Sequence, residues 1–176
     1  MNKNLVISAL GNDKPGIVNE LSKAILDQGG NISESRMTVL GGEFAMMLLV
    51  SGTEECIDSI IAKLEGTGEK LNLTLIAKET QKLESDKRWL PYQITVVSMD
   101  HPGIVHNISD FLSSHDLNIE EIETNTYPAA HTGTPMFSLE MTISVPADSS
   151  VRSLRDEFIT FCDDLNLDAS LESKRS

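Results

Sequence analysis

Apolar residues recur along the first half of the chain with two different periods. Residues 5–10 form an apolar run, which predicts a central strand. The apolar residues after it have the spacing of one helix face, at Ile17, Val18, Leu21, Ala24 and Ile25. Gly41-Gly42 then predicts a tight hairpin turn before a strand whose even-numbered residues over 44–50 are apolar. We expect a second helix after Thr53, with Glu54 and Glu55 at its start, and a short closing strand over residues 71–75.

The same series repeats in the second half of the chain. The sequence Asp13–Val18 recurs as Asp100–Val105, an offset of 87 residues. Residues 5–36 placed on residues 92–123 without a gap give 10 identities in 32 positions. This is several times the number expected by chance, so the chain is a tandem duplication.

The second copy is not a plain repeat of the first. Its two middle strands are separated by six additional residues within 127–135, where two prolines and a glycine predict a long exposed loop. Asp148 is expected to cap its second helix. Its closing strand is expected over residues 167–171, where apolar residues alternate with polar ones.

Each copy therefore predicts the order β-α-β-β-α-β of a ferredoxin-like module, and the fold class is α+β. Right-handed crossovers place both helices on one face of a four-stranded antiparallel sheet. The other face is left open, to be covered by the other copy or by another chain. We expect a first domain over 1–79, a charged linker over 80–89 and a second domain over 90–176.

The turn between the first strand and the first helix, Asp-x-Pro-Gly in both copies, is the most informative local feature. Pro15 suits a first helical position, and Asp13 can accept hydrogen bonds from the first-turn N–H groups. The turn can be simply a well-capped turn. Alternatively, its open N–H groups hold a carboxylate while Asn12 or Asp13 meets an ammonium group, which suits a small amino acid. The candidate ligand-binding residues are Asn12, Asp13, Pro15, Gly16, Ile17, Val18, Asp100, Pro102, Gly103 and Ile104.

This strand–turn–helix sequence, followed by Asn-Ile at residues 31 and 118, resembles the ACT domain, a regulatory module that commonly binds amino acids at module interfaces. Two copies, roughly 3–79 and 90–172, fill nearly the whole chain. Among ACT proteins, the length and the free-standing pair are most similar to bacterial repressors of the glycine cleavage genes. That resemblance implies a transcriptional regulator without its own DNA-binding domain, which restrains a LysR-type activator and is relieved by glycine.

The two copies differ at the turn itself. Asn12-Asp13-Lys14 in the first becomes Met99-Asp100-His101 in the second, and Gly29-Gly30 becomes Asp116-Leu117. We favour the first copy for ligand binding, because Asn12 adds a polar group and the glycine pair is expected to leave room.

The net charge is −13, with a net of −3 over residues 1–88 and −10 over 89–176. No lysine or arginine cluster is dense enough to bind nucleic acid directly, so an effect on genes would pass through another protein. The last helix carries four acidic residues, Asp156, Glu157, Asp163 and Asp164. They form either a solvated face or a patch for a basic partner.

The residues that enzymes need are not found in a recognisable pattern. His101 and His106 are five residues apart, a poor spacing for one helix face, and no metal-ligand or nucleophile motif accompanies them. Cys56 and Cys162 are expected to be buried free thiols. We therefore expect no catalysis, no metal and no cofactor. The absence of a signal-like or membrane-spanning apolar segment favours a cytoplasmic protein.

Two other functions stay open. The chain can be a regulatory subunit that gives amino-acid feedback control to a separate enzyme. It also resembles the first module of formyltetrahydrofolate deformylases, but their catalytic domain has no counterpart in this sequence. Open sheet edges leave homo-oligomerisation as a further alternative.

Overall fold

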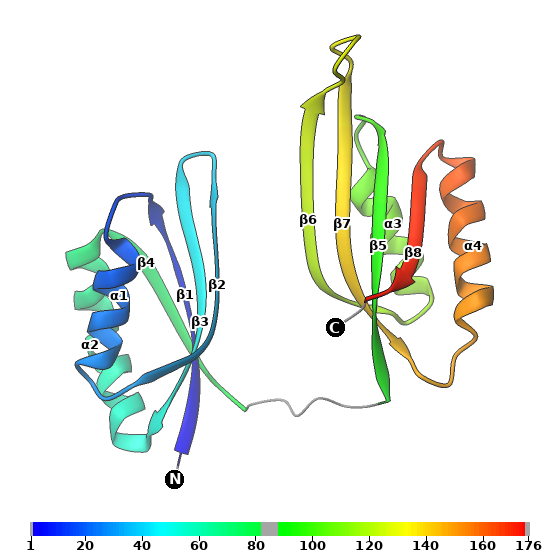
Figure 1. The fold of residues 1–176 in the computed structure, drawn as a ribbon. Helices are drawn as coiled ribbons and strands as arrows, with labels where there is room; N and C mark the ends of the chain where they lie inside the picture. Colours follow the sequence, from blue (N-terminus) through cyan, green and yellow to red (C-terminus); the bar gives the residue numbers. More distant parts are fainter. Residues whose placement is uncertain (1, 82–87, 175–176) are drawn as a thin grey trace. The chain divides into compact units, whose positions relative to one another are not determined.

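The chain divides into two compact units, a first unit of Met1–Glu84 and a second unit of Ser85–Ser176. The computed structural model describes residues 2–81 and 88–174. In each unit two helices cover one face of a four-stranded antiparallel sheet (Figure 1), so the predicted pair of ferredoxin-like modules is confirmed. Part of the expected linker lies outside the described residues, and the domain bounds stay a prediction.

The first unit has the sheet order β2-β3-β1-β4, with β1 in the interior as its apolar run predicts. Its elements are β1 (Asn2–Asn12), α1 (Ile17–Leu26), β2 (Asn31–Leu40), β3 (Glu43–Thr53), α2 (Glu54–Leu71) and β4 (Leu73–Thr80).

The second unit repeats this topology with the order β6-β7-β5-β8. Its elements are β5 (Trp89–Met99), α3 (Ile104–Ser114), β6 (Asn118–Pro128), β7 (Pro135–Pro146), α4 (Val151–Asp164) and β8 (Asp168–Ser173).

Each core lies between the sheet and its two helices. On β3 the side chains alternate strictly: Phe44, Met46, Leu48 and Val50 are buried, whereas Met47 is 56% exposed on the opposite face. In α1 the buried stripe consists of Ile17, Leu21 and Ile25. The predicted periods therefore identify the two surfaces that pack together.

The duplication extends to irregularities of the backbone. A bulge interrupts the pairing of β2 between Ile32 and Glu34, and the same bulge lies in β6 between Ile119 and Glu121, 87 residues later. The hairpins differ as predicted: the two residues Gly41-Gly42, both with positive φ, join β2 to β3, whereas residues 129–134 join β6 to β7.

Three details of the expected elements need correction or confirmation. The helix α2 begins directly after Thr53 as expected, and the Thr53 hydroxyl caps it by accepting a hydrogen bond from the Cys56 N–H at 3.3 Å. In α4 the cap is Ser150 and not Asp148, because the helix begins at Val151. Leu71 is the last residue of α2 and not part of the closing strand, since the left-handed Asn72 ends the helix there.

The neighbouring methionines of β3 provide a test of the buried face. Met46→Ala should lower the free energy of unfolding by about 2–5 kcal/mol, because it empties space in the core. Met47→Ala, on the open face, should change it by less than about 0.5 kcal/mol. Urea unfolding of the two variants beside the unmodified chain measures both values, and equal losses would contradict the assignment of the faces.

Candidate functional site

Both Asp-x-Pro-Gly turns are built in the same way. The Asp13 N–H donates to the Gly42 carbonyl at 3.2 Å, and the Asp100 N–H donates to the Pro135 carbonyl at 2.9 Å. Each turn is therefore tied to the start of the neighbouring strand of its own sheet. The glycine of each turn then adopts a left-handed conformation, with φ of 86° at Gly16 and 96° at Gly103.

The helix starts later than its proline suggests. Gly16 is the N-cap of α1 and the helix begins at Ile17, so Pro15 is not the first helical residue. Asp13 lies three residues before this cap, and no side chain caps the helix. The expectation that Asp13 accepts hydrogen bonds from the first turn is therefore wrong. The Ile17 N–H donates to the Lys14 carbonyl at 3.4 Å, so the N–H groups of Val18 and Asn19 are the ones in the first turn that stay open to an external acceptor.

The candidate residues of the first turn fall into an exposed polar group and an apolar pair at the start of α1. Asn12, Asp13, Pro15 and Gly16 are all exposed at the end of β1. The Asn12 amide donates to the Glu43 carboxylate at 3.3 Å. These polar groups lie on the surface beside the open helix end.

The two apolar residues of that candidate list, both predicted on the apolar stripe of the helix, lie in different surroundings, so the prediction is confirmed for Ile17 and wrong for Val18. Ile17 is buried and anchors the helix in the core. Val18 is 37% exposed and does not belong to the buried stripe, because it lies about 100° around the helix from Ile17.

The second turn follows the same division. Asp100, Pro102 and Gly103 are exposed, and Ile104 is buried. A shallow depression of about 530 Å³ adjoins this turn, lined by His101, Gly103, Ile104, Val105, His106, Ser109 and Phe137.

Sequence reasoning had not placed His106 and Ser109 at a site. They are three residues apart in α3 and so lie on the same side of the helix, but the spacing alone does not indicate a depression beside them.

Gly29-Gly30 does not provide room for a ligand at the turn. The pair follows the C-terminal end of α1, at the other end of the helix from Asp13. A Cβ on Gly30 would come within 2.8 Å of Ile25 and 2.9 Å of Ile60. Gly30 is therefore required by packing, and this part of the preference for the first copy is wrong.

Other candidate chemistry is sparse in the described part of the chain. No three His, Cys, Asp or Glu side chains converge there as metal ligands. Cys56 and Cys162 are free and buried, as predicted. Burial, followed by the charge of Asp163, raises the pKa of the Cys162 thiol to about 12, so it stays protonated at neutral pH. Among the described helices, none has the length and apolar character to cross a membrane.

Comparison with known proteins identifies the module first. Residues 3–78 match the model of the ACT domain family, which covers nearly all of the first unit. The turn, the open helix end and the sheet order described above thus belong to an ACT domain, a class of regulatory module.

The comparison over the whole chain is more specific. The chain is 30% identical over 167 residues to the glycine cleavage system transcriptional repressor of Escherichia coli K12, covering 95% of this chain and 88% of that protein. The protein of the same name from Shigella flexneri matches equally. The chain therefore belongs to the family of the glycine cleavage system transcriptional repressors and is a regulatory ACT protein.

Solved structures agree on the fold along the whole length. A protein of unknown function from Galdieria sulphuraria has a TM-score of 0.78 at 26% identity, covering 99% of this chain and 100% of its own. A crystal structure of a candidate glycine cleavage system transcriptional repressor has a TM-score of 0.74 at 24% identity, covering 100% and 99%.

The left-handed glycine of the turn gives a prediction. Gly16→Ala should destabilise the protein by about 1–2 kcal/mol, because alanine resists a φ of 86° even though nothing lies within 4 Å of its Cβ. Gly66→Ala, also with open space around the Cβ but within α2, should instead stabilise by about 0.5–1 kcal/mol. Thermal unfolding of both variants measures this, and a stabilising Gly16→Ala would contradict the turn geometry.

Proposed function

We propose that this protein represses the glycine cleavage genes through contact with a LysR-type activator, and that glycine relieves the repression. The observation that carries the proposal is the 30% identity to the Escherichia coli repressor over 95% of the chain. An identity spread over both modules supports a shared overall role rather than the reuse of one domain.

The distribution of charge supports action through a protein partner. The net charge of −13 opposes binding to a phosphate backbone. On the open face of the second sheet, Glu123 lies opposite Glu140, and Glu172 is exposed on the edge strand β8. The exposed acidic residues of α4 add to this field, including Asp163 and Asp164. A basic surface on the partner would complement the second unit.

The turn of the first unit has the groups that a glycine zwitterion needs. The uncapped N-terminus of α1 offers N–H groups and a positive helix end to the carboxylate. The exposed Asp13 carboxylate lies beside it and can accept from the ammonium group. Asn12 adds a second polar side chain, already oriented by Glu43. Glycine sensing at this turn is therefore chemically consistent with the exposed geometry.

The partner is tested by capture from a host lysate with the intact chain as bait. We expect a LysR-type protein, recovered less well when glycine is added. Asp163→Asn with Asp164→Asn should lower its recovery at least about threefold, because the pair contributes to the acidic field. Glu65→Gln with Glu69→Gln, the same charge change on α2, should leave recovery unchanged. Recovery of a metabolic enzyme instead would favour a feedback subunit and contradict the proposal.

The ligand is tested by calorimetric titration of the chain with glycine. Asp13→Asn should weaken binding at least about tenfold, because a charge-assisted hydrogen bond is lost. Asp58→Asn, an exposed aspartate on α2, is the matched control and should bind as before. The absence of heat with glycine would refute sensing, whereas loss of binding only in Asp100→Asn would place the ligand at the second turn.

A further inference from the structure

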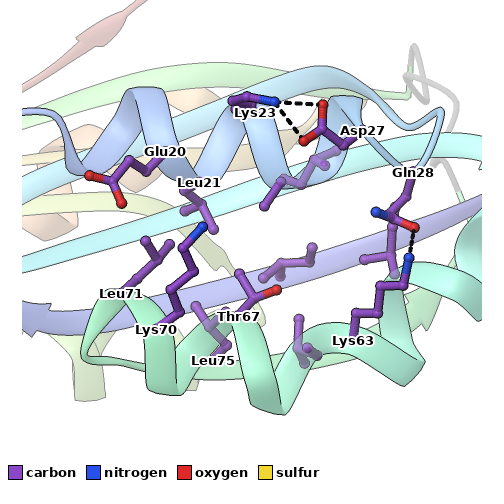
Figure 2. Close-up of a pocket in the computed structure, with 15 residues that line it drawn as sticks. Glu20, Leu21, Lys23, Asp27, Gln28, Lys63, Thr67, Lys70, Leu71 and Leu75 are labelled. Carbon is purple, nitrogen blue, oxygen red and sulfur yellow. Dashed lines mark hydrogen bonds and ion pairs between the residues drawn. The ribbon is translucent and has the colours of Figure 1, made fainter.

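The first unit contains a cavity away from the Asp-x-Pro-Gly turn, in the groove between α1 and α2. Its volume is about 280 Å³. Figure 2 shows the two helices on either side of it, with polar side chains along the rim. The floor consists of side chains that are buried in the core, Ile7, Leu21, Ile25, Ile60 and Leu71. The groove therefore combines an apolar base with a polar opening.

The duplicated module shows why this groove is open. Ala24 lines the cavity, and the residue 87 positions later is Phe111. In the second unit the Phe111 ring lies between the helices, 5.4 Å from the ring of Phe158 and 4.9 Å from that of Phe161. The same backbone thus holds an aromatic cluster where the first unit has an alanine and a cavity.

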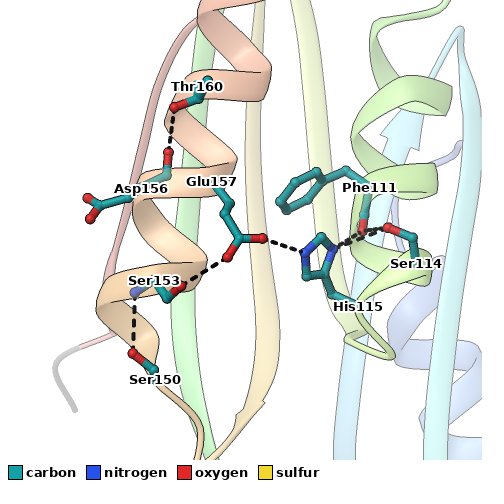
Figure 3. Close-up of polar contacts among 8 residues, drawn as sticks. All are labelled: Phe111, Ser114, His115, Ser150, Ser153, Asp156, Glu157 and Thr160. Atoms are coloured by element: carbon teal, nitrogen blue, oxygen red, sulfur yellow. Dashed lines mark hydrogen bonds and ion pairs between the residues drawn. The ribbon is translucent and has the colours of Figure 1, made fainter.

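The aromatic cluster is bordered by a hydrogen-bonded pair of side chains, His115 and Glu157. Figure 3 shows His115 stacked on Phe111, with ring centroids 4.3 Å apart, and directed toward Glu157 at 3.2 Å. A hydrogen bond with the Phe111 carbonyl, and then Glu157, raise the pKa of His115. In the second unit aromatic rings therefore fill the space between the helices, and His115 and Glu157 are partners of each other.

In the first unit the charges at the rim are not all satisfied. Lys23 forms an ion pair with Asp27 at 2.7 Å. Lys63 donates to the neutral amide oxygen of Gln28 at 2.6 Å, and Lys70 forms no ion pair within the described residues. With Glu20 also on the rim, three lysines face two carboxylates, a net charge of +1. This is a local positive site in a chain of net charge −13.

Two lysines of the rim and the threonine between them lie on one side of α2. Lys63, Thr67 and Lys70 are spaced i, i+4 and i+7, so all three project to the same side of the helix. Thr67 is half-buried between the two lysines and adds a hydroxyl donor. An anion at this rim would meet two ammonium groups and a hydroxyl, with the apolar floor beneath it.

We propose that this groove binds a small aliphatic carboxylate, with the carboxylate at the Lys63–Thr67–Lys70 rim and the hydrocarbon tail on the apolar floor. A single negative charge matches the net charge of the rim, and a volume of about 280 Å³, slightly below that of most ligand cavities, suits a small molecule. An α-amino acid fits less well, because its ammonium group would lie beside the two lysines. This site is separate from the turn and independent of the proposed sensing of glycine.

The proposal is tested by titrating the full chain separately with butanoate, hexanoate and octanoate. Changes in the NMR spectrum of the protein during each titration measure the affinity. Affinity should rise about fourfold for each added methylene until the floor is covered, as expected for apolar burial. Ala24→Phe, which introduces the residue of the second unit, should abolish binding. Lys63→Gln with Lys70→Gln should weaken it about tenfold. Lys78→Gln, on a strand outside the groove, should leave it unchanged.

Three results would overturn the proposal. One is no binding of octanoate up to about 10 mM, and another is binding that the two-lysine variant leaves unchanged. The third is leucine binding as well as 4-methylpentanoate, which has the same carbon skeleton without the ammonium group. If circular dichroism shows that Ala24→Phe does not fold, the two-lysine variant and its Lys78→Gln control decide the outcome.

Discussion

The packing of two helices against one face of each sheet is the constraint on which the rest of the molecule depends. Because side chains alternate along a strand, burying Phe44 and Met46 against the helices forces Met47 to the open face. The same packing fixes the start of α1 beside the end of β1, where Ile17 anchors the helix in the core. The Asp-x-Pro-Gly turn has to span this junction, and Gly16 makes it possible by adopting a positive φ.

Much of this arrangement could be predicted from the sequence, because it depends on periodicity and on glycine pairs. The stripe of α1 and the turn at Gly41-Gly42 are examples. The errors arose where local chemistry depends on the residue at which a helix begins or ends: Asp13 lies three residues before the N-cap of α1, too far to cap it, and Leu71 is the last residue of α2. Gly30 looked like space for a ligand, but the side chains that fill that space come from distant segments.

The candidate sites show the same limit. The exposed residues of the first turn lie next to one another, as their sequence predicts, because the turn itself holds them together. His106 and Ser109 were missed, since a depression depends on what the surrounding side chains leave empty. The groove of the first unit could not be predicted for the same reason. The sequence shows that Ala24 in the first copy corresponds to Phe111 in the second, but only the packing of the surrounding side chains shows that this difference opens a cavity. Duplication thus preserved the backbone and let the interiors diverge.

The most direct measurement is a mobility-shift experiment with glycine cleavage promoter DNA, purified LysR-type activator and this protein. Control by protein contact requires that the acidic chain alone leaves the DNA unshifted, because its net charge is −13. It should alter the mobility of the activator–DNA complex, and glycine should reverse this change. A shift of the promoter DNA by this protein without the activator would contradict the central claim.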